Sequence, residues 1–256
     1  MRPLAGPRCL ADSHGDMRHL FALLALLAPI ALPAQAQPVT VFAAASLRGA
    51  LTEIAETYQD GATLSFGGSG TLARQVAAGA PVDVVVFAHL DWIQWLAARD
   101  LILPHSLRQV AGGRLVLIGG ADAAPLPAPN GATLLAALNG GRLAIGQRDG
   151  VPAGIYAREW LQHISAWDAL LPHLAETDNV RAALALVAQG AAPLGGVYAS
   201  DAVAEARVTV LYAIPDDTHS PIRYPAAAVT EAGRAFVALL STPQAAAIFA
   251  KHGFAP

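Results

Sequence analysis

Residues 39–47, VTVFAAASL, set a pattern that the rest of the chain repeats. Four of the first five residues are apolar and most are β-prone, which predicts a buried strand, and Ser46 then opens an amphipathic helix over residues 46–59. A strand that leads directly into a helix is the repeating unit of open α/β sheets. This stretch therefore predicts an α/β protein.

The alternation of strand and helix continues to the end of the chain. The predicted strands that follow are 63–66, 82–87, 114–118, 142–145, 195–198, 209–213 and 224–230, and the predicted helices are 71–78, 91–99, 153–163, 180–189 and two more before the C-terminus. We expect open, mostly parallel sheets flanked by helices. The segment 121–130, ADAAPLPAPN, is expected to be a surface loop within a lobe.

The N-terminus predicts export. An apolar run at residues 20–32, LFALLALLAPIAL, follows Arg18 and His19 and precedes the small-x-small pattern that ends at Ala36. The run is shorter than the roughly 20 residues that a transmembrane helix needs. We therefore predict a signal peptide over residues 1–36 with cleavage after Ala36, and Met17 remains open as an alternative start to Met1.

Charge and cysteine content exclude several classes of function. The full chain has 16 basic residues (Lys and Arg) and 19 acidic residues, and residues 1–36 hold three of the basic and two of the acidic ones. The mature chain therefore has 13 basic and 17 acidic residues, a formal net charge of −4. This balance does not favour nucleic acid as a partner. Cys9, the only cysteine, precedes the apolar run, so the mature chain is expected to have no disulfide, no thiolate nucleophile and no Cys-based metal site.

Several predicted helices begin where a strand has just ended. Ser46, Ser69, Ala153 and Val180 occupy these helix starts, two in each half of the chain. The first N–H groups of a helix have no intrahelical acceptor, and with the helix dipole they favour an anion. Ligands of open α/β sheets lie at the carboxyl ends of strands, so the four starts predict a site for a small oxyanion between two lobes.

Each of these residues also has a plainer interpretation. Ser46 can be a helix N-cap, residues 68–70 a tight turn, and Tyr198 a half-buried packing residue. Two enzyme readings stay open as well. GSGTLA at 68–73, with Asp91 about 20 residues on, fits a dinucleotide fingerprint, and Ser69 in GGSGT resembles a hydrolase nucleophile motif that lacks its final glycine.

Longer segments resemble a known family, the periplasmic molybdate-binding proteins of ABC importers. The resemblance spans residues 39–254 and rests on several segments in the same order. They are VFAAASL at 41–47, GTLARQ at 70–75, GAPVDV at 79–84, NGGRLAIG at 139–146, VPAGIYA at 151–157, AWD at 166–168, NVRAALALV at 179–187, APLGGVYASDA at 192–202, and PQAAAIF and GF near the end.

The resemblance implies a two-lobed type II periplasmic-binding-protein fold that closes on one tetrahedral dianion. It implies lobe 1 over residues 38–116 and 219–256, lobe 2 over 117–218, and a ligand cleft between them. The implied ligand is molybdate or tungstate, with sulfate as an alternative. No enzyme activity and no cofactor are implied. The expected partner is a membrane permease, and the protein is expected to be a periplasmic monomer.

The family's ligand positions carry over residue by residue. The resemblance implies that Ser46 and Ser69 offer hydroxyl and N–H donors, that Ala153 and Val180 offer N–H donors, and that Tyr198 offers its hydroxyl. Arginines near the helix starts, such as Arg181, match no ligand position and are expected to be solvated. Gly68 and Gly70 depart from the family, because relatives can have serine at both places. The glycines allow a closer approach of the backbone but remove two hydroxyls.

Overall fold

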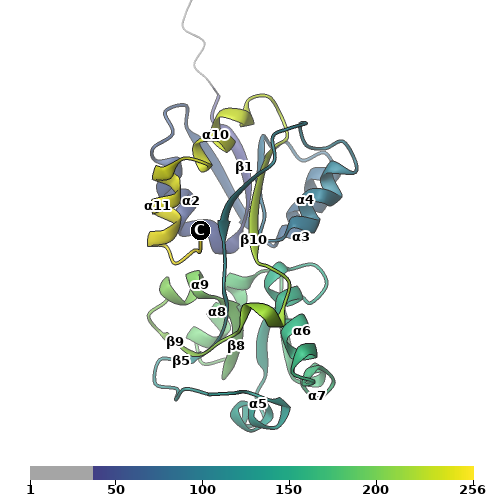
Figure 1. Cartoon of the computed structure of the whole chain (residues 1–256), viewed down its shortest axis with the longest axis vertical. Helices are drawn as coiled ribbons and strands as arrows, with labels where there is room; N and C mark the ends of the chain where they lie inside the picture. Colours follow the sequence, from purple (N-terminus) through teal and green to yellow (C-terminus); the bar gives the residue numbers. More distant parts are fainter. Residues whose placement is uncertain (1–36) are drawn as a thin grey trace, which may run out of the picture. The chain divides into compact units, whose positions relative to one another are not determined.

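Two five-stranded mixed sheets organise residues 37–256, the part of the chain that the computed structural model describes (Figure 1). The predicted signal peptide, its cleavage site after Ala36, and Cys9 lie outside the described residues. Among residues 37–256, no helix has both the length and the apolar character needed to span a bilayer.

The first sheet has the strand order β2-β1-β3-β10-β4. β1, β2 and β3 run parallel, whereas β10 runs antiparallel to both of its neighbours. This sheet and its helices are called lobe 1 below. Its strands are β1 (Val39–Ala44), β2 (Ala62–Gly67), β3 (Val84–Val86), β4 (Arg108–Gly112) and β10 (Arg223–Ala228).

The second sheet repeats the arrangement with the order β7-β6-β8-β5-β9. β6, β7 and β8 are parallel, and β5 is antiparallel to β8 and β9. Each sheet therefore has one strand in its fourth position that opposes the other four. This sheet and its helices are called lobe 2. Its strands are β5 (Leu115–Gly120), β6 (Leu143–Gly146), β7 (Leu174–Thr177), β8 (Leu194–Tyr198) and β9 (Val208–Ala213).

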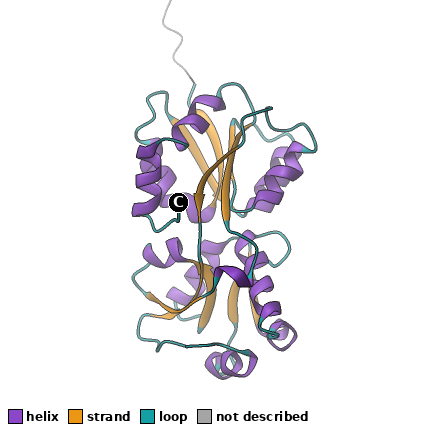
Figure 2. Cartoon of the chain, in the orientation of Figure 1, coloured by secondary structure: helices purple, strands orange, loops and turns teal. Residues whose placement is uncertain are grey.

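Helices flank both sheets (Figure 2). Their apolar faces pack on the strands and their polar faces remain exposed, as in α2, which buries Ala50, Leu51 and Ile54. Lobe 1 has η2 (Ala45–Leu47), α2 (Arg48–Ala55), α3 (Ser69–Ala77), α4 (Leu90–Ala97), α10 (Gly233–Leu240) and α11 (Pro243–Lys251). Lobe 2 has α5 (Gly131–Leu138), α6 (Pro152–His163), α7 (Trp167–Leu170), η3 (Leu171–His173), α8 (Val180–Ala188) and α9 (Ala199–Val203).

The chain passes between the two sheets twice. Two residues, Gly113 and Arg114, separate β4 in the first sheet from β5 in the second. The return runs from β9 through residues 214–222, which include η4 (Asp216–Thr218), into β10. Only these two connections join the sheets within residues 37–256, and they lie side by side in Figure 1. They are the natural hinge of the molecule.

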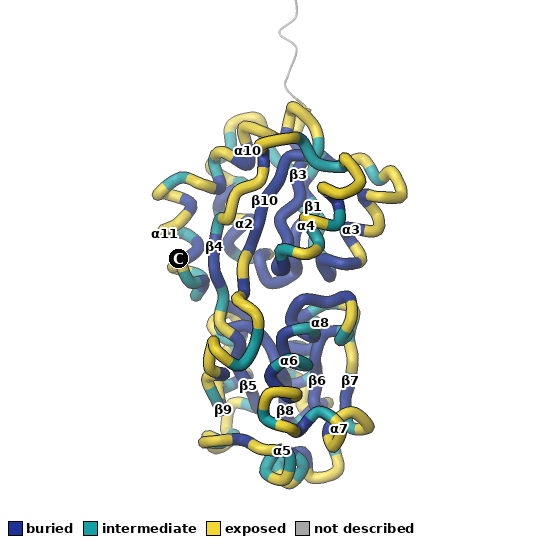
Figure 3. Tube along the Cα trace, turned by 45° about the vertical axis from the view of Figure 1, so that its right-hand side comes forward, coloured by how far each residue is buried: buried dark blue, intermediate teal, exposed yellow. Residues whose placement is uncertain are grey.

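The central strands are buried on both faces (Figure 3). All three residues of β3 have no exposed surface, and the alternate residues Val41 and Ala43 of β1 are equally buried. Helices on both sides of a parallel sheet require such continuous apolar strands. Burial of each Val or Leu contributes about 1.5–3 kcal/mol, so these strands supply the main stabilisation of lobe 1.

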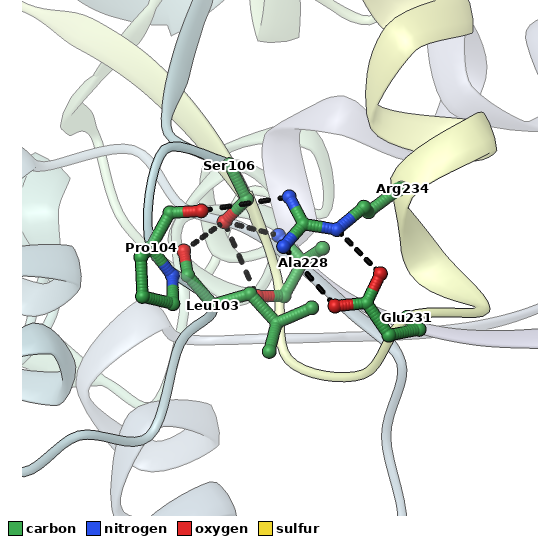
Figure 4. Close-up of polar contacts among 6 residues, drawn as sticks. All are labelled: Leu103, Pro104, Ser106, Ala228, Glu231 and Arg234. Carbon is green, nitrogen blue, oxygen red and sulfur yellow. Dashed lines mark hydrogen bonds and ion pairs between the residues drawn. The ribbon is translucent and has the colours of Figure 1, made fainter.

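A polar network fixes the late strand β10 to the rest of lobe 1 (Figure 4). The Ser106 hydroxyl donates to the Leu103 carbonyl at 2.7 Å and accepts the Ala228 N–H at 3.2 Å. Leu103 N–H in turn donates to the Ala228 carbonyl at 2.8 Å. Arg234 reaches the Pro104 carbonyl and pairs with Glu231 at 2.6 Å. The C-terminal end of β10 is thereby joined to the loop between α4 and β4.

The structure confirms the α/β class and most of the predicted elements, with differences at particular places. The helix predicted over 46–59 starts with the 3-10 turn η2 and ends at Ala55. The strand predicted over 224–230 ends at Ala228. Strands β4 and β7 and helices α5, α7 and α9 were not predicted. The segment 121–130 is a loop, as expected.

Candidate functional site

The five residues that the sequence singled out line one small pocket between the lobes. Ser46 and Ser69 come from lobe 1, and Ala153, Val180 and Tyr198 come from lobe 2. All five are buried, with at most 4 % of their surface exposed. The remaining lining residues are Ala44, Ala45, Gly67, Gly68, Ala88, Val151 and Pro152. None of the residues that line the pocket has a charged side chain.

Strand ends and helix starts bring these residues together. Ser46 lies in η2, directly after β1, and Ser69 is the first residue of α3, after β2. Ala153 is the second residue of α6, and Pro152 before it fixes the backbone for the first helical turn. Val180 begins α8, whose N-cap Asn179 accepts the Ala182 N–H at 3.1 Å. The capping side chain leaves the Val180 N–H open.

The pocket is rich in hydrogen-bond donors. The N–H groups of the two serines, Ala153 and Val180 donate to no other backbone carbonyl within residues 37–256. This is the geometry of helix N-termini, where the first N–H groups have no partner inside the helix. Partial positive charge from the helix dipoles of α3, α6 and α8 adds to these donors. The backbone of both lobes therefore offers a site for an anion.

The three hydroxyls are also available. Ser69 Oγ accepts the Ala88 N–H at 3.1 Å, so its own proton remains to be donated elsewhere. Ser46 Oγ lies 3.3 Å from the Tyr224 hydroxyl, and either oxygen can be the donor. Tyr198 Oη is buried and has no hydrogen-bond partner among the described residues. A buried hydroxyl without a partner is costly, so the Tyr198 hydroxyl is open to a ligand or a water molecule.

Burial keeps the tyrosine hydroxyls protonated. It raises the pKa of Tyr198 well above the ordinary value, and the neighbouring Tyr224, Tyr156 and Asp201 raise it further. Burial likewise raises the pKa of Tyr224, although its hydrogen bond with Ser46 opposes the shift. Protonated phenols can donate hydrogen bonds, so both groups are able to act as donors at neutral pH.

A buried ion pair lies behind the pocket. Arg181 Nε is 2.8 Å from Oδ1 of Asp201, whose side chain is fully buried, although this N–H is not aligned for a hydrogen bond. Oδ2 of the same carboxyl accepts the Tyr198 N–H at 3.2 Å. Burial raises the pKa of Asp201 to about 6, while Arg181 and the Tyr198 N–H act to lower it. Arg181 is therefore a partner of this carboxyl, and the expectation of a simply solvated side chain is wrong.

Several contacts close the seam between the lobes around the pocket. The Tyr156 hydroxyl of lobe 2 donates to the Ala88 carbonyl of lobe 1 at 3.2 Å. Gly70 N–H of lobe 1 donates to the Gly150 carbonyl of lobe 2 at 3.1 Å. Arg181 reaches the Ser46 carbonyl at 3.5 Å. Each of these bonds requires that the lobes lie close together.

The pocket itself is narrow. Its cavity volume is about 10 Å³, close to the space of one water-sized sphere. A larger groove of about 640 Å³ lies beyond Tyr156 and His89, whose rings stack at 5.0 Å between centroids. Its lining includes Trp92, Trp95, Asp91, Asp149, Arg158, Glu159 and Arg223. Unlike the pocket, this groove has charged side chains of both signs.

The enzyme readings find no support in the geometry. No histidine lines the pocket, and no hydrogen bond joins Ser69 to an imidazole among the described residues. Gly68 follows β2, which is an edge strand of the lobe 1 sheet. A dinucleotide fingerprint normally follows the first strand of its unit. Within residues 37–256, no cluster of His, Cys, Asp or Glu is arranged to hold a metal ion.

Comparison with known families identifies the class of protein. The model of the family described as bacterial extracellular solute-binding protein matches residues 39–255. The chain belongs to this family. It is thus a solute-binding protein and not an enzyme.

Individual relatives of this solute-binding protein cover nearly its whole length. The molybdate-binding protein ModA of Escherichia coli is 41% identical over 92% of this chain and 96% of its own. ModA of Haemophilus influenzae is 36% identical over 84% and 89%. The solved periplasmic molybdate-binding protein of Azotobacter vinelandii, 24% identical, aligns with a TM-score of 0.75 over 85% of this chain and 99% of its own. The last match confirms the two-lobed type II periplasmic binding fold.

Sequence reasoning missed the residues that support the pocket from behind. Tyr156, Asp201 and Tyr224 form hydrogen bonds with residues that line the pocket, but they were not predicted. Tyr156 and Asp201 occur inside segments that carry the family resemblance. Nothing in their spacing separates them from ordinary packing residues, because their roles arise from contacts between elements far apart in the chain.

Proposed function

We propose that this solute-binding protein captures molybdate, or tungstate of nearly the same shape, in the pocket between its lobes. The ligands in this proposal are the N–H and hydroxyl groups of Ser46 and Ser69, the N–H groups of Ala153 and Val180, and the Tyr198 hydroxyl. The observation that carries it is the convergence of five buried donor residues from both lobes on a pocket without a charged lining residue. The names and identities of the ModA relatives support the choice of anion.

The donor set suits a fully deprotonated dianion. Hydrogen bonds to a charged acceptor are stronger than those between neutral groups, and fixed backbone donors bring no counter-charge that must be desolvated. Phosphate near neutral pH still carries a proton that requires an acceptor. A pocket of donors alone leaves that proton unpaired, so it disfavours phosphate relative to molybdate, tungstate or sulfate.

Binding and closure are coupled in this proposal. An anion can contact donors from both lobes only when the lobes are close, so it favours the closed form by the difference in affinity. The two connections between the sheets, at residues 113–114 and 214–222, provide the hinge.

The remaining parts of the proposal concern delivery. The protein is exported by a signal peptide over residues 1–36, is cleaved after Ala36, and works as a monomer in the periplasm. It hands its anion to the membrane permease of an ABC importer. Lobe 1 over 38–116 and 219–256 and lobe 2 over 117–218 are the two bodies that move. Sheet membership, with β5 starting at Leu115, supports a first boundary a few residues earlier than 116.

A ligand screen tests this function directly. The mature protein is melted in the presence of molybdate, tungstate, sulfate or phosphate, and each dissociation constant is then measured by calorimetric titration. We expect molybdate and tungstate to raise the melting temperature most and phosphate not to raise it, since ligands of the folded state stabilise it by mass action. Failure of molybdate and tungstate to bind would reject the proposal. The mass of the exported protein, measured by mass spectrometry, identifies the cleavage site.

A further inference from the structure

Gly68 and Gly70, on either side of Ser69, face the backbone of the opposite lobe. An ideal Cβ on Gly68 would lie 2.4 Å from the Asp178 carbonyl oxygen and 3.2 Å from a methyl carbon of Val151. An ideal Cβ on Gly70 would lie 2.4 Å from the Gly150 carbonyl oxygen. These neighbours belong to lobe 2 and precede the starts of α6 and α8. The Gly70 Cβ would in addition lie 2.5 Å from a ring carbon of Trp92 in α4 of lobe 1.

Glycine is needed at these positions because there is no room for a Cβ atom. The backbone conformation itself would allow any residue. Gly68 has φ −69° and ψ 132°, an extended geometry that any residue adopts. Gly70 lies within α3 and also has an ordinary φ. The close approach of the two backbones allows a hydrogen bond between the lobes, in which Gly70 N–H donates to the Gly150 carbonyl at 3.1 Å. The missing Cβ atoms therefore permit the contact between the lobes.

A side chain at position 68 would limit how closely the two lobes can approach each other. Carbon and oxygen atoms in ordinary contact are about 3.4 Å or more apart, so a Cβ would hold this part of the seam open by roughly 1 Å. The neighbour is a backbone carbonyl, which cannot turn away as a flexible side chain can. N–H···O hydrogen bonds have donor–acceptor distances of about 2.7–3.2 Å. A displacement of this size therefore matters most for the smallest ligand.

We propose that Gly68 and Gly70 let the lobes close far enough to grip a tetrahedral dianion smaller than molybdate, so that sulfate is also a ligand of this pocket. This inference rests on the proposed function of the same site. The narrow cavity of about 10 Å³ supports it, because lobes that approach this closely leave room that a smaller anion fills better. The two glycines thus widen the range of anion sizes that the pocket accepts.

The variant Gly68→Ala tests whether an added Cβ limits the approach of the two lobes. The atoms closest to its added methyl all lie in lobe 2, so lobe 1 can fold unchanged. The control is Gly120→Ala at the end of β5, where an added Cβ meets no atom within 4 Å and φ is ordinary. Thermal melting verifies that each protein folds. Dissociation constants for sulfate and molybdate are measured by calorimetric titration, sulfate at up to millimolar concentration.

We expect wild-type protein and Gly120→Ala to bind both anions. Gly68→Ala should weaken sulfate roughly tenfold or more and should change molybdate less than about threefold, because the larger anion keeps the lobes apart in any case. A general loss of stability would weaken both anions alike. The inference is overturned if the wild type binds molybdate but not sulfate, or if Gly68→Ala leaves the ratio of the two affinities unchanged. Binding of sulfate without molybdate would instead reject the molybdate assignment and retain the inference.

Discussion

The narrow pocket and the large groove differ in almost every property that governs ligand binding. The groove is about 640 Å³ and is lined by side chains of both charges, among them Asp91 and Arg158. The pocket is about 10 Å³ and has no charged side chain in its lining. Yet the pocket holds the open helix N-termini and the unpartnered Tyr198 hydroxyl. The proposal for the oxyanion site therefore rests on fixed donors and not on the size of the cavity.

Charges in the two regions are also held differently. In the groove, Arg158 pairs with Asp149 at 2.6 Å, and both side chains are partly exposed. Beside the pocket, Asp201 is fully buried and meets Arg181. Exposed pairs contribute little because solvent screens them, whereas a buried charge changes the free energy of unfolding strongly. The following experiments exploit this contrast.

The largest effect is expected in the pH dependence of stability. The pKa of Asp201 is raised from 3.8 to about 6 in the folded protein, so the folded state binds the proton more tightly than the unfolded state. This contribution is complete below about pH 4 and is lost as the pH rises to about 6, by up to about 3 kcal/mol. Urea unfolding at several pH values should show that Asp201→Asn lacks this decline.

The exposed groove residue Asp91 supplies the control for that experiment. Asp91→Asn should retain the wild-type decline between about pH 4 and 6. If Asp201→Asn and the wild type lose the same free energy of unfolding over this range, the buried carboxyl does not titrate as inferred.

Removal of the serine donors should weaken anion binding by a comparable amount. We expect Ser46→Ala and Ser69→Ala each to lower molybdate affinity by about 1–3 kcal/mol, since each removes a donor to a charged acceptor. Ser69→Ala should cost more, because it also leaves the Ala88 N–H without its acceptor. Calorimetric titration measures the change. Wild-type affinity in both variants would reject the site.

Tyr198→Phe should change binding and stability in opposite directions. The variant loses a hydroxyl donor, so molybdate affinity should fall by about 1.5–2 kcal/mol. The free energy of unfolding without anion should rise by about 1 kcal/mol, because a buried hydroxyl without a protein partner is removed. Chemical unfolding and titration measure the two quantities separately. A loss of both stability and affinity would mean that this hydroxyl has a structural partner instead of a ligand.

The smallest effect is expected in the groove. The side chain of Asp91 is 79% exposed, so Asp91→Asn should change molybdate affinity by less than about 0.5 kcal/mol. Salt should reduce even this difference because exposed charges are screened within about 10 Å. A change as large as that of the serine variants would place the groove, and not the pocket, at the centre of binding.

Strands with apolar sequence could be predicted, and polar edge strands could not. β3 reads VVV and is buried on both faces, so hydrophobicity alone reveals it. β4, RQVAG, exposes its first two residues, and it is a strand because it pairs with β10, more than 100 residues later. β7, LAET, likewise lies at the edge of its sheet. Pairing with distant residues leaves no local periodicity to read.

The candidate site likewise has features that local sequence could predict and features that it could not. Helix starts after strands could be recognised from local sequence, which is why Ser46 and Ser69 were found from the residues themselves. Ala153 and Val180 mark helix starts in the same way, although they contribute only main-chain N–H groups. The role of the Tyr198 hydroxyl came from the family resemblance alone. The approach of Gly68 to the Asp178 carbonyl depends on how two lobes meet. No property of a single segment encodes that distance.

The position of β10 has a consequence for how the protein is made. β10 is the last strand in the chain, yet it lies between β3 and β4 in its sheet. A chain that emerges N-terminus first must therefore hold β4 without its neighbour until residue 228 has appeared, whereas residues 115–213 already contain every strand of the other sheet. The first sheet therefore cannot be completed until the last segment of the chain has been synthesised, whereas the second sheet can form earlier.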